Sequence, residues 1–295
     1  MKYAGVVVLY NPGDDLFDNI NSYINFLDNL YIVDNTPGVD RTQDFSDYDK
    51  VKYIPLNDNK GIAYALNVGA KQAIKDKCDW LLTMDQDSCF EGNSLGEMII
   101  FIEECKKSDV ICDIVGSKYE QIGIVSPFHV TERTNDINPK GIDWPLVVMT
   151  SGNLVNLNAY KKVDGFKDWM FIDCVDFDFC LNLRRNDYEI VQLNYSRLNH
   201  KLGDTIKKKI FGKTFYVDNH SSFRRYFICR NRHYLYDMFA NDFPLYCKLE
   251  LKRTKREMLK IWLFEKNKIK KTFQIYRGYK DYKNGIKGGY NDRKK

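Results

Sequence analysis

Trp80-Leu81-Leu82-Thr83-Met84-Asp85-Gln86-Asp87 is the most informative stretch of this sequence, because a continuous apolar run ends in two carboxylates. A short apolar run of this kind is typical of a strand that is covered on both faces of a sheet. In open α/β sheets, ligands bind just beyond the carboxyl ends of the strands. We therefore expect a buried strand that brings Asp85 and Asp87 to a ligand site at the edge of a sheet.

Similar apolar runs recur along the first 200 residues, and helical patterns lie between them. One such pattern places Ile62, Leu66, Ala70 and Ala73 on a single helix face. Alternating strands and helices predict an α/β fold with a mostly parallel, Rossmann-like sheet flanked by helices. The other strands are expected at Ala4–Tyr10, Leu30–Asp34, Val51–Ile54, Gly123–Ser126, Leu146–Thr150 and Glu189–Leu193.

The C-terminal third differs in charge from the rest of the chain. Residues 201–295 contain 26 Lys and Arg against 9 Asp and Glu, whereas residues 1–200 contain 19 against 31. We therefore predict an α/β domain over residues 1–205 and a basic, mainly helical region over residues 206–295. A basic region suits an anionic partner, and a solvated helical face is the simpler alternative.

Several classes of protein do not fit the composition. No stretch reaches the ~20 apolar residues of a membrane-spanning helix, and the eight cysteines contain no C-x-x-C pair. They are expected to be buried thiols in a reducing cytoplasm, which is the predicted location. No zinc-finger spacing or RNA-binding signature appears, and the acidic domain would repel phosphate, so nucleic acid is not an expected partner.

Asp85 and Asp87 are candidate ligands of a divalent cation. Two carboxylates one residue apart repel each other unless a cation neutralises them, and Mg²⁺ and Mn²⁺ favour carboxylate oxygens. Such ions keep coordination positions for diphosphate oxygens. His200 follows the last predicted strand, from which it would reach the same ion.

Polar residues also follow two other predicted strands. Tyr10 and Asn11 come after the first strand, and Asp34 ends the second. Each group alone is typical of a turn, but three groups on one sheet edge favour a shared ligand site.

Asn59 and Gly61 open the helix that carries Asn67. A helix N-terminus can bind a phosphate or ribose oxygen, although an ordinary helix cap is the more common reason for such residues.

Three acids, Asp173, Asp176 and Asp178, lie among bulky apolar residues. A carboxylate in apolar surroundings has a raised pKa, which suits a general base. The alternative is that these acids stabilise the start of a helix through its dipole. Downstream, His220, Arg224 and Arg225 form a group of donors suited to a diphosphate.

The order of these motifs resembles glycosyltransferase family 2 over roughly residues 4–235. The motifs are Tyr10-Asn11-Pro12, Val33-Asp34-Asn35, Asn59–Gly69, Asp85-Gln86-Asp87, Thr150–Asn153, Asp173–Asp178 and His200-x-x-Gly203. The Asp-Gln-Asp form and the segment His220–Tyr226 are most similar to the bacterial rhamnosyltransferase branch. The resemblance implies a GT-A type fold, with residues 1–205 binding a nucleotide sugar and the acceptor.

The resemblance also implies roles for individual residues. Asp176 matches the catalytic base, but Val175 replaces the Glu that commonly precedes it, which leaves Asp173 and Asp178 as possible substitutes. Asp87 would bind Mn²⁺ or Mg²⁺ directly, and His200 would complete the metal site. The nucleotide would contact Tyr10, Asn11, Asp34, Asn59, Gly61, Asn67 and Asp85. The donor or acceptor pocket would contain Thr150, Ser151, Gly152 and Asn153.

The implied reaction is inverting, metal-dependent transfer of a sugar to a hydroxyl of a polysaccharide or a polyprenyl-diphosphate-linked acceptor in bacterial surface glycan assembly. The donor expected first is dTDP-rhamnose, and galactofuranose, galactose or glucose donors are alternatives within the enzyme class. A non-catalytic nucleotide- or nucleic-acid-binding protein is the alternative of another class.

The basic region has two expected roles. Met258, Ile261, Trp262, Ile269, Phe273 and Tyr276 recur with helical spacing among lysines. This pattern predicts one basic amphipathic helix over Met258–Tyr276. Such a helix would lie on anionic lipid at the inner face of the cell membrane, or it would pack on protein and form a homodimer.

Overall fold

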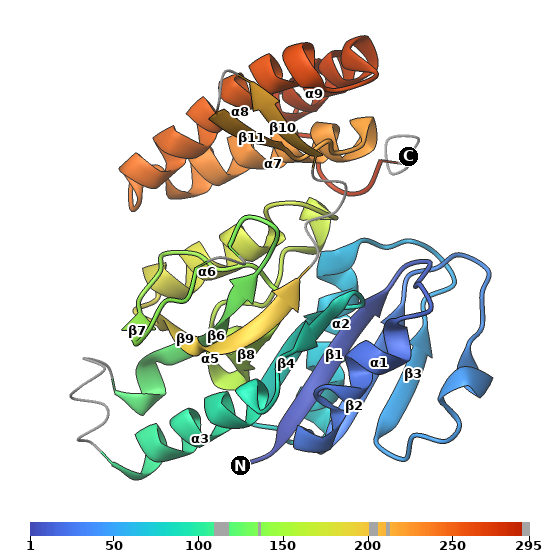
Figure 1. Ribbon diagram of the computed structural model, residues 1–295, viewed down its shortest axis with the longest axis vertical. Coiled ribbons are helices and arrows are strands. Elements are labelled where there is room, and N and C mark those ends of the chain that lie inside the picture. The colour runs from blue at the N-terminus through green and yellow to red at the C-terminus, as the bar shows by residue number, and fades with distance from the viewer. Residues whose placement is uncertain (109–117, 135–136, 201–205, 211–212, 291–295) are drawn as a thin grey trace.

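The computed structural model describes residues 1–108, 118–134, 137–200, 206–210 and 213–290, and the side chains of residues 206 and 208–215 are excluded. Figure 1 shows an α/β unit around a curled central sheet, with a layer of three helices and a small hairpin above it. Among the described residues, no helix is both long enough and apolar enough to cross a bilayer.

The central sheet has the strand order β3-β2-β1-β4-β8-β6-β9-β5, and β7 pairs with β9. The strands from β3 to β4 are parallel, β8 runs antiparallel to both neighbours, and β6 is parallel to β9. This mixed sheet confirms the predicted α/β class. The strand bounds are β1 Tyr3–Leu9, β2 Asn29–Asp34, β3 Val51–Pro55, β4 Trp80–Asp85, β5 Ser88–Phe90, β6 Ile122–Val130, β7 Ile142–Asp143, β8 Asn153–Asn156 and β9 Glu189–His200.

Helices cover both faces of the sheet because each strand alternates its side chains between the two sides. On β1, Val6 joins the cluster packed under α2, whereas Val7 joins the cluster packed under α3. The α-helices of this unit are α1 Leu16–Asn21, α2 Ile62–Lys75, α3 Ser94–Lys107, α5 Leu157–Lys162 and α6 Val175–Arg185. Short 3₁₀ turns occur at η1 Ile24–Phe26, η2 Thr42–Phe45, η3 Tyr119–Gln121 and η4 Asp168–Met170.

The prediction of a strand at Leu146–Thr150 is wrong, and the strand of this region is β8, which begins three residues after the end of the predicted one. Gly152 has a φ of 84°, and its amide donates to the Thr83 carbonyl at 2.7 Å. Thr83 Oγ1 in turn donates to the Thr150 carbonyl at 2.6 Å. These contacts turn the chain before β8, so the apolar residues ahead of the turn form a wall of the cleft described below. Apolar residues of a cleft wall and of a buried strand share one sequence pattern.

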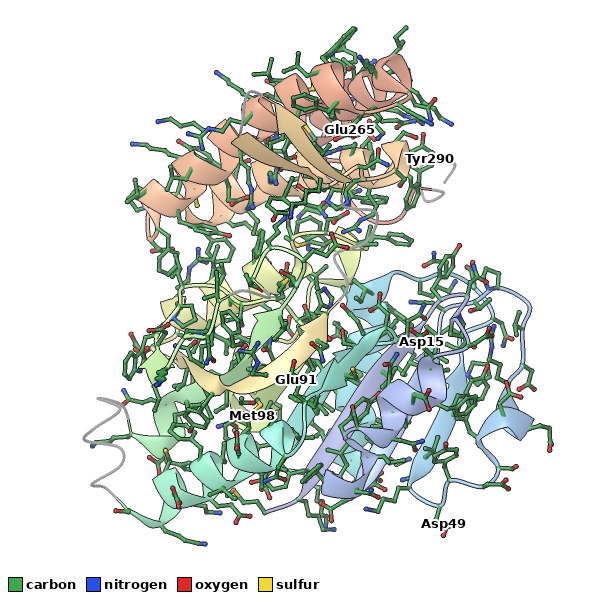
Figure 2. The ribbon with its side chains drawn as sticks, viewed as in Figure 1. Asp15, Asp49, Glu91, Met98, Glu265 and Tyr290 are labelled. Atoms are coloured by element: carbon green, nitrogen blue, oxygen red, sulfur yellow. The ribbon has the colours of Figure 1, made fainter. Side chains whose placement is uncertain are left out.

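The C-terminal region consists of the antiparallel hairpin β10 Ile206–Ile210 and β11 Lys213–Val217, followed by α7 Ser222–Phe239, α8 Pro244–Phe264 and α9 Lys268–Lys283. The single helix predicted over Met258–Tyr276 is wrong, because the chain breaks between α8 and α9. At the break, Asn267 has a φ of 55°. Glu265 is buried there between Arg225 at 2.7 Å and Lys271 at 2.6 Å. Figure 2 shows Glu265 within this helical layer. Helical periodicity does not reveal a break that is fixed by a buried ion pair.

Candidate active site

A cleft of about 800 Å³ lies between the carboxyl ends of the central strands and the C-terminal region. Its lining joins residues from β4, β6, β9, α6 and α7, which are far apart in the sequence. Of the residues singled out in the sequence, the cleft is lined by Asp85, Asp87, Thr150, Asp173, Asp176, His200, His220 and Arg224.

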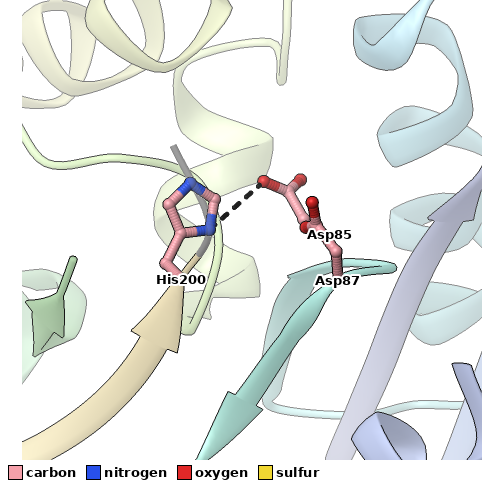
Figure 3. A group of neighbouring side chains, drawn as sticks. All are labelled: Asp85, Asp87 and His200. Carbon is pink, nitrogen blue, oxygen red and sulfur yellow. Dashed lines mark ion pairs between the residues drawn. The ribbon is translucent and has the colours of Figure 1, made fainter. Parts of the chain in front are cut away.

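Asp85, Asp87 and His200 form one cluster in this cleft (Figure 3). The register of β5 and β9 creates it, because Ser88 lies opposite His200 in the antiparallel pair and Asp87 directly precedes Ser88. One donor atom from each of the three side chains lies within 4.8 Å of the others. His200 Nδ1 is 4.0 Å from an Asp85 carboxylate oxygen and 2.8 Å from Ser88 Oγ.

The chemistry of this cluster fits a hard divalent cation. Burial raises the pKa of the Asp85 carboxyl, and the charge of Asp87 acts in the same direction, whereas His200 and Arg224 oppose it. Two acids that destabilise each other as anions gain most from a shared cation. Two carboxylates and one imidazole are a donor set that suits Mn²⁺, and the carboxylates also suit Mg²⁺.

His129 contacts this cluster indirectly, through Ser151, and the sequence did not indicate this role. Its Nε2 lies 2.7 Å from the Ser151 carbonyl, and Ser151 Oγ accepts the Asp85 amide at 3.1 Å. Burial lowers the pKa of His129 to about 4, so the ring is neutral at pH 7 and donates its Nε2 proton to Ser151. His129 lies near the end of a strand with no flanking motif, and the sequence around it carries no signal of this role.

Asp176 lies across the cleft, at the start of α6. Burial raises the pKa of its carboxyl to about 7, and the charges of Asp173 and Asp85 act in the same direction. The loop before the helix has positive φ at Phe171 (67°), Asp173 (64°) and Cys174 (64°). Such backbone strain in residues other than glycine is concentrated at functional sites. The geometry and protonation of Asp176 therefore suit a general base near neutral pH.

The two alternative acids have different surroundings. Asp173 is held by Arg224 in a bidentate ion pair, with Nη2 at 2.6 Å and Nε at 3.3 Å. Asp178 is buried and is absent from the cleft lining. Burial also raises the pKa of Asp178 to about 7. Of the three acids, Asp176 combines access to the cleft with a carboxylate that no arginine of the described chain binds.

Gly61 fixes the distance between α2 and the strained loop. Its φ is 88°, and a Cβ at this position would lie 2.5 Å from the Phe171 carbonyl oxygen. The next amide, of Ile62, donates to the same oxygen at 2.7 Å. Asn35 holds the segment from the other side, with its Nδ2 donating to the Gly61 carbonyl at 3.1 Å. Gly61 therefore positions the loop that carries Asp173 and Asp176.

Replacing Gly61 by alanine is expected to lower the free energy of unfolding by about 2 kcal/mol more than replacing Gly38, because only the first change forces overpacking. Gly38 is a matched control, since its φ is 68° and nothing lies within 4 Å of its Cβ position. Urea unfolding measures both changes. Equal losses in the two variants would show that backbone strain alone, and no contact with Phe171, determines the cost.

The residues predicted to bind the nucleoside gather at the ends of β1 and β2. Asp34 is fully buried, accepts from Tyr53 Oη at 2.9 Å and pairs with Arg41. The Asn11 amide donates to Thr36 Oγ1 at 2.9 Å. Tyr10, which is exposed, is fixed through its backbone by the Gln86 side chain. Asn59 Oδ1 accepts the Gly61 amide at 3.1 Å.

Asn67 and Arg225 do not line the cleft, and neither do Tyr10, Asn11, Asp34, Asn59 and Gly61. Asn67 accepts from Tyr160 Oη at 2.6 Å and donates to the Phe166 carbonyl at 2.7 Å, so it joins α2 to the core. Arg225 is buried against Glu257 and Glu265. Both polar side chains bond to other residues of the protein interior and are not directed at a ligand. The residue type alone does not show which of these two roles a polar side chain has.

The comparisons with known proteins agree with this geometry. A sequence model of Glycosyl transferase family 2 matches residues 6–155. The chain is 28% identical, over 258 residues, to the dTDP-rhamnosyl transferase RfbF of Shigella flexneri, and the match covers 81% of each protein.

Solved structures share the fold at low sequence identity. TarS of S. aureus has a TM-score of 0.58 at 14% identity, covering 97% of this chain and 49% of that one. A structure of TarS 1–349 in complex with UDP-GlcNAc has a TM-score of 0.56 at 14% identity, covering 96% and 80%. GalNAc-T7 with UDP, GalNAc and Mn²⁺ has a TM-score of 0.50 at 11% identity, covering 72% and 45%. The chain thus spans about half the length of the longer TarS chain and of the GalNAc-T7 chain in these structures.

The family match, the curated relative and the fold together define a nucleotide-sugar glycosyltransferase of the GT-A type. The chain belongs to Glycosyl transferase family 2, and over most of its length it is similar to a rhamnosyltransferase. The predicted family, fold class and enzyme class are confirmed.

Proposed function

We propose that the enzyme transfers L-rhamnose from dTDP-rhamnose to a hydroxyl of a polysaccharide or polyprenyl-diphosphate-linked acceptor, with inversion at the anomeric carbon. One observation carries the proposal: Asp176 shares a single cleft with Asp85, Asp87 and His200. The choice of donor is supported by the similarity to RfbF, a dTDP-rhamnosyl transferase.

Asp87 and His200, with Asp85 beside them, would hold Mn²⁺ or Mg²⁺. When bound, such an ion supplies positive charge that offsets the negative charge developing on a leaving diphosphate. The protein supplies further positive charge from Arg224, which also lines this cleft. The charge of Asp173 raises the pKa of Arg224, although burial opposes it, so this group stays cationic. Asp173 therefore acts as a positioning residue for Arg224.

Asp176 serves as the base in a single displacement. The acceptor hydroxyl gives its proton to the Asp176 carboxylate, while its oxygen forms a bond to the anomeric carbon. The bond between that carbon and the diphosphate oxygen breaks, and its electron pair leaves with the diphosphate. Because the nucleophile enters opposite the leaving group, the product has inverted configuration. General-base catalysis of this kind is typically worth ~10²–10⁴-fold.

His220 is proposed to contact the diphosphate as a neutral donor. Burial lowers the pKa of its imidazole, and the charge of Arg224 acts in the same direction. Tyr10, Asn11, Asp34, Asn59 and Gly61 would surround the nucleoside, because they lie at the ends of β1 and β2 and at the start of α2.

Residues Thr150–Asn153 would form the donor or acceptor wall. Thr150 lines the cleft, and Ser151 holds the Asp85 amide through Oγ. Gly152 leaves no room for a Cβ, which would lie 2.7 Å from Leu198. This close packing supports a rigid wall beside the acidic cluster.

Thermal shift with a panel of nucleotide sugars tests the donor. In the presence of Mn²⁺, dTDP-rhamnose is expected to raise the melting temperature more than UDP-GlcNAc, UDP-galactose, UDP-galactofuranose or UDP-glucose. The rise should shrink when EDTA replaces Mn²⁺, because the diphosphate loses its counter-charge. A larger shift with any of the UDP-sugars would reject rhamnose as the donor.

A further inference from the structure

The outer face of α8 and α9 exposes large apolar side chains. Leu259 is 62% exposed and Leu263 is 58% exposed at the end of α8, and Ile269 is 79% exposed at the start of α9. On α8, Leu245, Leu249, Leu259 and Leu263 lie on one side, since their spacing follows the helical turn. This outer apolar face consists of Leu245, Leu249, Leu259, Trp262, Leu263, Ile269, Phe273 and Tyr276. Leu259, Trp262, Leu263 and Ile269 flank the break between the two helices, whereas Leu245 and Leu249 lie near the start of α8.

The acidic and basic residues of these helices lie on different sides: the acids face the protein interior and the exposed charges are basic. Each acid of α8, of α9 and of the break between them is turned inward. Glu250 pairs with Arg232, and Glu257 pairs with Arg225 and Arg232. The two others are the buried residues Glu265, paired with Lys271, and Asp281, which accepts from Tyr226. The exposed charges on α8, α9 and their connection are therefore basic: Lys248, Lys252, Arg253, Lys255, Arg256, Lys266, Lys270, Lys280 and Lys283.

We propose that this outer face of α8 and α9 docks on the surface of an anionic lipid bilayer. Leucine, isoleucine and aromatic side chains interleaved with lysine and arginine are the composition of helices that lie in a membrane interface. The basic residues attract anionic headgroups, and the apolar residues enter the boundary of the acyl region.

Two other binding partners, a nucleic acid and a second copy of the chain, match the side chains of the outer apolar face less well. A nucleic acid would match the lysines but would leave the exposed leucines, Trp262 and Phe273 facing a hydrophilic backbone. A second copy of the chain, docked through the same face, would bring two clusters of lysine together without an exposed acid of α8 or α9 to pair them. A bilayer satisfies both the apolar and the basic side chains.

The position of α8 links this face to the cleft. Glu257 and Arg253 of α8 line the cleft, while Leu259 and Leu263 are exposed on the same helix. Because a helix with its side chains is only ~10 Å across, a bilayer under this face lies close to the cleft mouth. Lipid binding itself requires neither donor nor metal, so its test is independent of the proposed reaction.

Vesicle flotation with the full-length chain tests the proposal. The protein is expected to float with phosphatidylcholine vesicles that contain one-third phosphatidylglycerol, and to bind pure phosphatidylcholine vesicles at least ~10-fold more weakly. Raising the salt concentration should weaken binding to the anionic vesicles, because ions screen the lysines. Equal binding to both vesicle types would overturn the role of charge.

A triple variant, Trp262→Ser with Leu263→Ser and Ile269→Ser, is expected to lower partition to anionic vesicles at least ~10-fold. Its matched control is Trp144→Ser with Ile100→Ser and Ile137→Ser, which likewise removes one tryptophan and two aliphatic side chains, from exposed positions elsewhere. The control should float like the wild type. Both variants should melt at the wild-type temperature, since none of the six residues is buried.

Charge reversal at Lys266→Glu and Lys270→Glu should also weaken binding, whereas reversal at the exposed residues Lys71 and Lys161 should not.

Equal flotation of the triple variant and its control would overturn the proposal. The proposal would also be overturned if the triple variant floated normally but sedimented as a smaller species than the wild type. In that case the outer apolar face would join two copies of the chain. Displacement of the protein from vesicles by DNA, with no dependence on Trp262 and Leu263, would also overturn it.

Discussion

Replacing Asp176 by asparagine is expected to lower turnover more than ~100-fold and, at pH 8, to make the protein more stable. Turnover falls because the amide cannot accept the proton of the acceptor hydroxyl. Donor affinity should be nearly unchanged, because Asp176 is assigned to the acceptor hydroxyl and not to the diphosphate. The gain in stability follows from the burial that raises the pKa of Asp176.

The sign of the stability effect follows from proton binding. The pKa of Asp176 is about 7 in the folded chain against an ordinary value of 3.8. Between these values the folded state binds more protons than the unfolded state, so stability falls as pH rises toward 7. Above pH 7 the buried carboxylate costs on the order of a few kcal/mol. Asparagine carries no such cost, so its advantage should be larger at pH 8 than at pH 5.

The same pKa predicts the pH dependence of the wild-type reaction. A base must be deprotonated, so turnover should rise as pH increases through about 7. Initial rates with purified donor and acceptor measure this profile, and thermal melts at pH 5 and pH 8 measure stability.

Asp178→Asn is the matched control, because burial raises the pKa of Asp178 to about 7 as well. It lies on the same helix but is absent from the cleft lining. We expect a similar gain in stability at pH 8 with turnover close to wild type. Loss of turnover in Asp178→Asn, together with normal turnover in Asp176→Asn, would transfer the role of base to Asp178.

Replacing Asp87 by alanine is expected to lower turnover by about 1000-fold and to weaken Mn²⁺ binding. Asp87 shares its cluster with Asp85 and His200, and the variant loses one of the two carboxylates that would hold the ion. The loss of charge stabilisation at a leaving diphosphate is worth several kcal/mol, and each ~1.4 kcal/mol changes the rate tenfold. The fold should persist, since Asp87 is only partly buried and the cluster carries one negative charge less.

Calorimetric titration with Mn²⁺ and initial-rate assays measure the two effects. Asp47→Ala, a change of an exposed acid outside the cleft, serves as control and should match the wild type in both. Wild-type Mn²⁺ affinity in Asp87→Ala would falsify the assignment of this ligand. Full activity of the wild type after removal of divalent ions with EDTA would reject the metal site altogether.

Local sequence determined the elements that carry the site. The apolar run Trp80–Met84 became β4, and Asp85 and Asp87 lie at its carboxyl end as predicted. The pattern at Leu66, Ala70 and Ala73 became the buried side of α2. These predictions succeed because the period of apolar residues records which side of an element is buried.

The helix break and the turn that depend on contacts between distant residues could not be predicted from the period of apolar residues. The break between α8 and α9 depends on Glu265, whose partner Arg225 comes from α7. The chain turns at Gly152 because of contacts with Thr83. The sequence around Leu146–Thr150 therefore has the pattern of a strand and the structure of a cleft wall.

By itself, the sequence determined the fold class, the family and the set of acids from which a metal ligand and a base are drawn. Only the tertiary structure decided which of them meet. The register of β5 and β9 brings His200 to Asp87, and packing turns Arg224 toward the cleft and its neighbour Arg225 into the protein. Sequence patterns report burial over a few turns of chain, whereas a binding site depends on contacts between distant segments, and packing of the whole chain sets those contacts.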